Sequence, residues 1–437
     1  MSALHSLDAD IASRLETRRQ AVAAGWNAGA EAVLIGAGDP VHIPGRADRT
    51  YPFRAHSEYF YLTDRERPGG VLAFDADEGW VDFVVPVSRD ELVWEGAPAD
   101  AQEGVPIDEL AGWLAARRGR PIVNLGAPIH ALDGAGPGGG EKLTAEFRRH
   151  LNRVRRPKDA IELERMRVAE RATSAGFAAI VPLLGAGRTE RGVQIELEAE
   201  FFRRGADALA FETIVASGPN SAVLHFPPTA KSLEQGELVL IDAGGEFRGY
   251  ASDVTRTYPV SGSFTAEQAA LHELVRRAGE AATSLCRPGV EFSDLHLTAA
   301  LTIAEGLTDF GLLHGSPQAL LESGTVSLFF PHGIGHMAGL GVRDAGEVLP
   351  GRAPASGMPR LRADLPLESG HVVTVEPGIY FIPALLSDAD TRRRLHAEVN
   401  WARVDELLSF GGIRIENDVL IGDEGPEILT ADIPILG

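Results

Sequence analysis

The fold is decided by residues 236–260, which read GELVLIDAGGEFRGYASDVTRTYPV. Within this stretch we predict two strands, at 238–241 and 250–254, joined by the glycine-containing turn GGEFRG. In a symmetric hairpin Asp242 and Asp253 would lie opposite each other, with Cβ atoms roughly 5 Å apart. Two carboxylates at that distance repel each other unless they share a proton or a cation. The hairpin therefore indicates either an aspartyl dyad or a metal site.

A second motif, FFPHGIGH at 329–336, holds two histidines four positions apart. On a helix His332 and His336 would face the same way, as in some zinc proteases. Gly333 and Gly335 favour a loop instead, and no Glu follows His332 directly. We therefore expect one metal-ligating histidine and one that supports a ligand or faces the substrate.

Two further carboxylates follow apolar segments. Glu376 ends the predicted buried strand VVTVE, and Glu416 ends the strand GGIRIE. A carboxylate is costly to bury without a partner. Strand alternation puts Arg414 and Glu416 on one face, so an ion pair within a sheet explains that strand as well as a site does.

Together, these motifs supply four carboxylates and one imidazole, which is too much charge for an apolar core. Hard oxygen donors with one nitrogen suit Mn²⁺, with Co²⁺ or Zn²⁺ as alternatives. Two such ions about 3.5–4 Å apart can be bridged by carboxylates and can hold a hydroxide between them. The combined motifs therefore favour a dinuclear metal centre over an aspartyl dyad.

The chain divides near residue 155. The upstream part predicts a small α/β domain over 1–154, because helices and strands alternate at 8–25, 32–35, 70–74, 81–87, 107–117 and 122–125. The glycine-rich stretch 133–140 lacks the GK[ST] ending of a phosphate-binding loop, so we interpret it as a plain loop.

The downstream part, 155–437, is predicted to be a second domain. Pro157 precedes a capping box formed by Asp159 and Glu162, and an apolar helical stripe continues to Ile180. Further helices are predicted at 189–204, 265–285 and 293–310, with a strand-rich block at 212–260 and strands toward the end. A weak two-half organisation of this domain is compatible with that order.

Composition limits the partners. The chain has 437 residues, of which 44% are hydrophobic and 24% charged, and 62 Asp and Glu against 41 Lys and Arg give a formal charge of −21. Such a charge repels nucleic acid and anionic lipid, so neither is an expected partner. Cys286 is the one cysteine, which excludes an intrachain disulfide. Without a signal-like or membrane-spanning apolar run, we expect a cytoplasmic protein.

Four segments resemble the creatinase–aminopeptidase–prolidase metallopeptidase group in their residues and in their order along the chain. They are IDAGGEFRGYASDVTRTYPV, PHGIGHMAGLGV, VVTVEPGIYF and FGGIRIENDV. The resemblance covers roughly 155–437 and implies an α+β fold with a pita-bread catalytic domain. YPFRAHSEYFYLTDRERPGGVLAF, at 51–74, is similar to the N-terminal domain of aminopeptidase P and some prolidases.

The resemblance also implies roles for single residues. The metal ligands would be Asp242, Asp253, His336, Glu376 and Glu416, and Glu376 would also be the general base. His225 matches a histidine near the substrate and leaving group, and His332 one that stabilises the tetrahedral intermediate. Arg414 matches an arginine that meets a substrate carboxylate or supports the ligands.

One position departs from the pattern. Relatives usually read V-H-D after the GHMAGL segment, whereas this chain has Val342-Arg343-Asp344. Arginine cannot shuttle protons, but it can bind a carboxylate through two parallel hydrogen bonds. We therefore expect Arg343 to bind the substrate C-terminus.

The implied reaction is hydrolysis of the Xaa-Pro bond of a small peptide by a homodimer with two bound metals. A prolidase cuts dipeptides only, whereas aminopeptidase P removes the first residue of longer peptides. Between Glu376 and Glu416 the chain carries the insertion 381–412, which is similar to bacterial prolidases, so we favour the dipeptidase. A noncatalytic binding protein is the remaining alternative, disfavoured because all five ligands are present.

Overall fold

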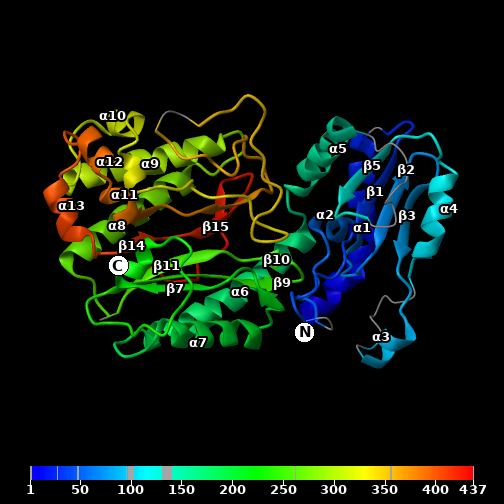
Figure 1. Cartoon of the computed structure of the whole chain (residues 1–437), viewed down its shortest axis with the longest axis horizontal. Helices are drawn as coiled ribbons and strands as arrows, with labels where there is room; N and C mark the ends of the chain where they lie inside the picture. Colours follow the sequence, from blue (N-terminus) through cyan, green and yellow to red (C-terminus); the bar gives the residue numbers. More distant parts are fainter. Residues whose placement is uncertain are drawn as a thin grey trace. The chain divides into compact units, whose positions relative to one another are not determined.

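The structure is a computed structural model that describes residues 2–26, 28–46, 49–94, 96, 103–129, 140–260, 262–354 and 357–436. The glycine-rich residues 133–139 lie outside the described part. The chain forms two compact units, Met1–Arg155 (unit 1) and Arg156–Gly437 (unit 2), coloured from blue to red along the sequence in Figure 1. Along the chain, the division falls one residue after the boundary predicted from the sequence.

Unit 1 is built on a five-stranded sheet of order β4-β3-β2-β1-β5. Its strands are β1 (Ala32–Gly36), β2 (Val71–Asp75), β3 (Gly79–Val84), β4 (Val105–Pro106) and β5 (Ile122–Gly126). Its helices are α1 (Ser2–Trp26), α2 (Ser57–Thr63), α3 (Arg89–Trp94), η1 (Ile107–Glu109), α4 (Leu110–Ala115) and α5 (Gly140–Arg155). The strands β1 and β5 pair in parallel, whereas β1 and β2 are antiparallel, so the unit is a mixed α/β layer.

Unit 2 combines short sheets with long helices. The strands are β6 (Ala208–Leu209), β7 (Ile214–Ser217), β8 (Leu238–Ala243), β9 (Gly245–Phe247), β10 (Tyr250–Ala251), β11 (Val254–Pro259), β12 (Val372–Val375), β13 (Gly378–Tyr380), β14 (Gly412–Arg414), β15 (Asn417–Ile421) and β16 (Pro426–Ile428). The helices are α6 (Ala160–Ile180), η3 (Val181–Leu183), α7 (Glu190–Arg203), η4 (Gly218–Ala222), α8 (Ala266–Ser284), α9 (Phe292–Asp309), α10 (Pro317–Glu322), η5 (Val326–Leu328), α11 (Pro383–Leu386), α12 (Ala389–Arg394) and α13 (Trp401–Leu407).

The strands of unit 2 lie between two helix pairs, as Figure 1 shows. The pair α6 and α7 shares one hydrophobic core with β8 and β11, through residues such as Phe177, Phe201 and Ile241. The pair α8 and α9 shares another with β12, β14 and β15, through residues such as Val275 and Ile303. The unit is therefore α+β in two halves, and the ends of its strands meet between them.

The hairpin predicted within residues 236–260 exists, but its register differs from the symmetric prediction. Asp242 pairs with Thr255, not with Asp253, because the strands reverse at Arg248 and Gly249. Both of those residues have positive φ, 50° and 80°, as a two-residue type I′ turn requires. The register is thus shifted by two residues. An even shift keeps side chains on the same face, so Asp253 stays diagonal to Asp242 rather than opposite it.

The start of unit 2 follows the sequence prediction closely. Asp159 caps α6 by accepting hydrogen bonds from the backbone of Ile161 and Glu162, and the Glu162 side chain bonds back to complete the capping box. No helix among the described residues is both long enough and apolar enough to cross a membrane.

Candidate metal centre

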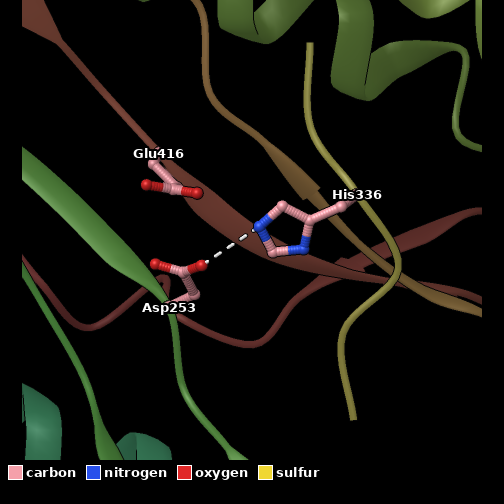
Figure 2. A group of neighbouring side chains, drawn as sticks. All are labelled: Asp253, His336 and Glu416. Atoms are coloured by element: carbon pink, nitrogen blue, oxygen red, sulfur yellow. Dashed lines mark ion pairs between the residues drawn. The ribbon is translucent and has the colours of Figure 1, made fainter. Parts of the chain in front are cut away.

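Three buried side chains from separate parts of unit 2 converge on one point. Asp253 lies between β10 and β11, His336 lies in the loop between η5 and β12, and Glu416 lies between β14 and β15. One donor atom from each lies within 4.8 Å of the others, and His336 Nε2 is 3.4 Å from Asp253 Oδ2 (Figure 2). One nitrogen and two carboxylate oxygens at this spacing can bind a divalent cation.

The hydrogen bonds around His336 leave its Nε2 free to bind a metal. Its Nδ1 lies 3.1 Å from the carbonyl of Met337, and burial lowers the pKa of the ring, which is therefore neutral. With the proton on Nδ1, Nε2 presents a lone pair toward Asp253. A backbone carbonyl that fixes the tautomer in this way is typical of metal-ligating histidines.

Asp242 and Glu376 complete the acidic group. Asp242 is at the end of β8, where its Oδ2 accepts a hydrogen bond of 2.5 Å from Arg414. Its other oxygen, Oδ1, is buried and has no hydrogen-bond partner among the described residues. A buried carboxylate oxygen in that state fits a site that a cation occupies.

Burial and crowding raise the pKa values of Glu416 and Asp253. Burial, and then the charges of Asp253, Glu376 and Asp242, raise the pKa of Glu416 well above its ordinary value. Burial and Asp242 raise the pKa of Asp253 in the same way. Carboxylates whose ionised forms are disfavoured in this way become stable anions once divalent cations lie between them, so the donor set fits a two-metal site.

Second partners hold two of these carboxylates in place. The Thr255 hydroxyl donates to Glu416 Oε2 at 2.6 Å, and the backbone N–H of Asp253 donates to Asp418 Oδ2 at 2.8 Å. Asp418 in turn lies beside Glu170 of α6, whose pKa burial raises to about 7.

Arg414 is fully engaged within the site. Its Nε donates to Thr255 Oγ1 at 2.9 Å, its Nη1 to the Tyr380 hydroxyl at 2.9 Å, and its Nη2 to Asp242. The residue is 3% exposed. Of the two roles that the sequence left open for Arg414, these contacts favour support of the ligands over contact with a substrate carboxylate.

Tyr380 links Arg414 to His332, and sequence reasoning missed it. The hydroxyl of Tyr380 lies 3.0 Å from His332 Nε2, while His332 Nδ1 lies 2.8 Å from the Gly333 carbonyl. Burial and then the charge of Arg414 lower the pKa of His332 to about 3, so the ring is neutral. A neutral ring that donates from Nδ1 accepts from Tyr380, which itself accepts from Arg414. The sequence indicated a role for Tyr380 only through its position, because this residue follows Glu376 on the next strand, β13.

His225 reaches the same space from a different segment. Partial burial and the nearby Arg414 lower the pKa of its imidazole. The segment that carries it is held at both ends by Glu190, another residue that the sequence did not reveal. The buried Glu190 carboxylate accepts from the backbone N–H groups of Ser217, at 2.9 Å, and Thr229, at 3.1 Å.

All nine residues predicted for the site line one cavity of about 1300 Å³ in unit 2. They are His225, Asp242, Asp253, His332, His336, Arg343, Glu376, Arg414 and Glu416. They come from five segments of the sequence, at 225, 242–253, 332–343, 376 and 414–416, and the fold brings them to one place. The arrangement provides metal ligands, a carboxylate base and neutral imidazoles beside one another, which is what hydrolysis at a metal centre requires.

Comparison with known proteins identifies the families that this chain resembles. Metallopeptidase family M24 matches residues 164–423, and the aminopeptidase P N-terminal domain matches residues 15–108. A probable Xaa-Pro aminopeptidase of Botryotinia fuckeliana is 30% identical over 402 residues, 88% of this chain and 86% of the relative.

Solved structures give the same picture. Aminopeptidase PepP of Pseudomonas aeruginosa is 30% identical, with a TM-score of 0.79 over 97% of this chain and 96% of its own. A zinc-substituted aminopeptidase P of E. coli in complex with product is 27% identical, with a TM-score of 0.78 over the same shares. The expected pita-bread catalytic domain behind an aminopeptidase-P-type N-terminal domain is thereby confirmed.

Proposed function

The chain belongs to metallopeptidase family M24, and from this premise we propose that it is an Xaa-Pro aminopeptidase with a dinuclear metal centre. The observation that carries the proposal is the convergence of Asp253, His336 and Glu416, with Asp242 and Glu376 lining the same cavity. These five residues would hold the metals, and their oxygen-rich donor set favours Mn²⁺, with Co²⁺ or Zn²⁺ as alternatives. As the sequence resemblance implies, the active form is proposed to be a homodimer.

A bound pair of divalent ions supplies Lewis acidity toward the scissile carbonyl and toward a nucleophilic water. The protein's residues supply the rest. Glu376 would accept the proton of the water, because its carboxylate lines the cavity beside the other proposed ligands. His225 would lie at the leaving nitrogen of proline.

His332 would stabilise the charge that develops on the carbonyl oxygen. In this structure both of its ring nitrogens are engaged, one by Gly333 and one by Tyr380. The role therefore requires Nε2 to exchange the Tyr380 hydroxyl for the substrate oxygen and to carry a proton itself, because only an N–H can donate to that oxygen.

The comparisons favour the aminopeptidase over the dipeptidase that the sequence led us to prefer, because the relatives are named Xaa-Pro aminopeptidases. The position of the insertion supports this choice. The insertion 381–412 forms α11, α12 and α13, whose side chains such as Leu386, Val404 and Leu407 pack into the core shared with α8 and α9. No residue between 377 and 413 lines the cavity, and all of them are described. Within one chain, the insertion therefore gives no reason to expect a limit on peptide length.

Substrate length can be tested with Ala-Pro and Ala-Pro-Ala-Ala as paired substrates. We expect release of free alanine from the longer peptide with a kcat/KM at least equal to that for the dipeptide. Hydrolysis of Ala-Pro alone would restore the dipeptidase interpretation. In the second outcome Arg343, which is exposed in the cavity, would be the group that binds the dipeptide C-terminus, and Arg343→Ala would raise KM for Ala-Pro.

A further inference from the structure

Three arginines line the active-site cavity with their charges unpaired. Arg343, Arg360 and Arg362 are all exposed, and none of their guanidinium groups has an ion-pair or hydrogen-bond partner within the described ranges of the chain. Arg352, from the same connection between η5 and β12, is different, because its Nη1 is bound by Glu291 at 2.6 Å and by Asp364 at 2.7 Å. This connection therefore neutralises one of its arginines internally and leaves three open to the cavity.

The position of these charges is unusual for the chain that carries them. With a formal charge of −21, the protein has carboxylates in excess, and a single exposed arginine would simply be solvated. Three that line one cavity, beside the carboxylates of the metal centre, offer guanidinium groups to a carboxylate that enters it.

Arg343 and Arg362 also influence the pKa values of side chains at the reaction centre. Behind burial and the charge of Arg414, both Arg343 and Arg362 contribute to the lowered pKa of His225. Arg362 likewise opposes the rise in the pKa of Glu376 that burial causes. Arg343 and Arg362 line the same cavity as His225, which is proposed to meet the leaving proline.

We propose that Arg343, Arg360 and Arg362 form an anionic subsite for the residues that follow proline, so that the enzyme prefers peptides with Asp or Glu there. The inference rests on the proposed Xaa-Pro aminopeptidase activity and adds the chemical class of its substrates. A free peptide C-terminus carries the same carboxylate chemistry, so a test must separate the two sources. Arginine suits either, because its planar guanidinium binds a carboxylate with two parallel bonds.

The test uses the metal-loaded full chain and three amidated peptides, Ala-Pro-Glu-Ala-amide, Ala-Pro-Gln-Ala-amide and Ala-Pro-Lys-Ala-amide. A fourth, Ala-Pro-Gln-Ala with a free C-terminus, measures the contribution of the terminal carboxylate. We expect kcat/KM to be about tenfold higher for the Glu peptide than for the Lys peptide at low ionic strength, since exposed pairs contribute modestly and several act together. The ratio should shrink as salt is added, because these pairs are solvent-exposed.

Variants assign the effect to the cavity. Arg360→Glu should bring the Glu-to-Lys ratio to about one or below it. Arg277→Glu changes the charge by the same amount on the exposed face of α8, away from the cavity, and should leave the ratio unchanged. Equal kcat/KM for all three amidated peptides would overturn the subsite, as would a ratio that Arg360→Glu does not change. A preference only for the free C-terminus would limit the arginines to that carboxylate and contradict an acidic side-chain site. Failure to cleave any of the four peptides would instead refute the proposed activity, and the subsite with it.

Discussion

Single residues of this site depend on partners from distant parts of the sequence. Arg414 binds Asp242 and Tyr380 at once, and Tyr380 carries the contact on to His332. The guanidinium thereby fixes one oxygen of Asp242, a proposed metal ligand, and leaves its other oxygen without a hydrogen-bond partner among the described residues. In a low-dielectric interior such a connected chain of hydrogen bonds is stronger than its separate members.

Tyr380→Phe tests this chain. The variant removes one hydroxyl and leaves a buried N–H of Arg414 and Nε2 of His332 without their partner, which costs about 1–3 kcal/mol for each unsatisfied group. We expect kcat for Xaa-Pro hydrolysis to fall roughly ten- to a hundredfold while bound metal stays at two ions per chain. Steady-state kinetics with metal analysis of the same samples checks it. Unchanged kcat would remove Tyr380 from the reaction.

At the scale of elements, the loop before β12 is shaped by close packing against that strand. The backbone N–H of Thr374 donates to the His336 carbonyl, and the backbone N–H of Glu376 donates to the Ile334 carbonyl. Gly335 sits where the two segments touch, because a Cβ there would lie 2.0 Å from the Thr374 carbonyl oxygen. The loop thus reaches β12 only with glycine at this position, and that contact places His336 beside Glu376.

Gly335→Ala should push the loop off β12. Overpacking of this kind costs about 1–3 kcal/mol of folding stability, and displacement of His336 should weaken metal binding as well. The matched control is Gly333→Ala, whose added methyl would meet Leu361 Cδ2 at 3.2 Å, a side-chain atom that can move. Metal titration and thermal unfolding of both variants decide the matter. Equal metal affinity in the two would show that the loop has other ways to place its histidine.

The elements were readable from the sequence to different degrees. Long helices such as α8 and the capping box of α6 follow from local patterns, which the chain itself carries. The hairpin register was wrong by two residues because it depended on where the turn formed, at Arg248 and Gly249. Tyr380 and Glu190 could not be assigned, since their roles arise from tertiary contacts alone. The insertion 381–412 favoured a dipeptidase, whereas its packing into the core could not be predicted from the sequence and the names of the relatives favour the aminopeptidase.

For the molecule as a whole, acid stability is governed by buried histidines as well as by the carboxylates. Burial lowers the pKa of His272 and of His296 to about 4 and that of His371 to about 3. In the unfolded chain each titrates near 6.5. Between pH 6.5 and 4 the unfolded chain therefore binds more protons than the folded one, so the free energy of unfolding falls as the pH falls.

His296→Phe isolates one of these contributions. The residue is 1% exposed on α9 and packs against the Phe330 ring, so phenylalanine suits the position. Between pH 7.5 and pH 5 the parent protein should lose on the order of 2 kcal/mol more unfolding free energy than the variant. Urea unfolding of the metal-free proteins at both pH values measures this without the pH dependence of metal binding. Parallel losses in the two proteins would show that His296 is protonated in the folded state as readily as in the unfolded one.

We propose that Xaa-Pro hydrolysis depends on two metal ions held by Asp242, Asp253, His336, Glu376 and Glu416. The most direct test is to strip the purified protein with a chelator, confirm metal removal, and titrate Mn²⁺ while following hydrolysis of Ala-Pro-Ala-Ala. We expect no hydrolysis by the metal-free protein and full recovery when two ions are bound per chain. Full activity after complete metal removal would contradict the claim.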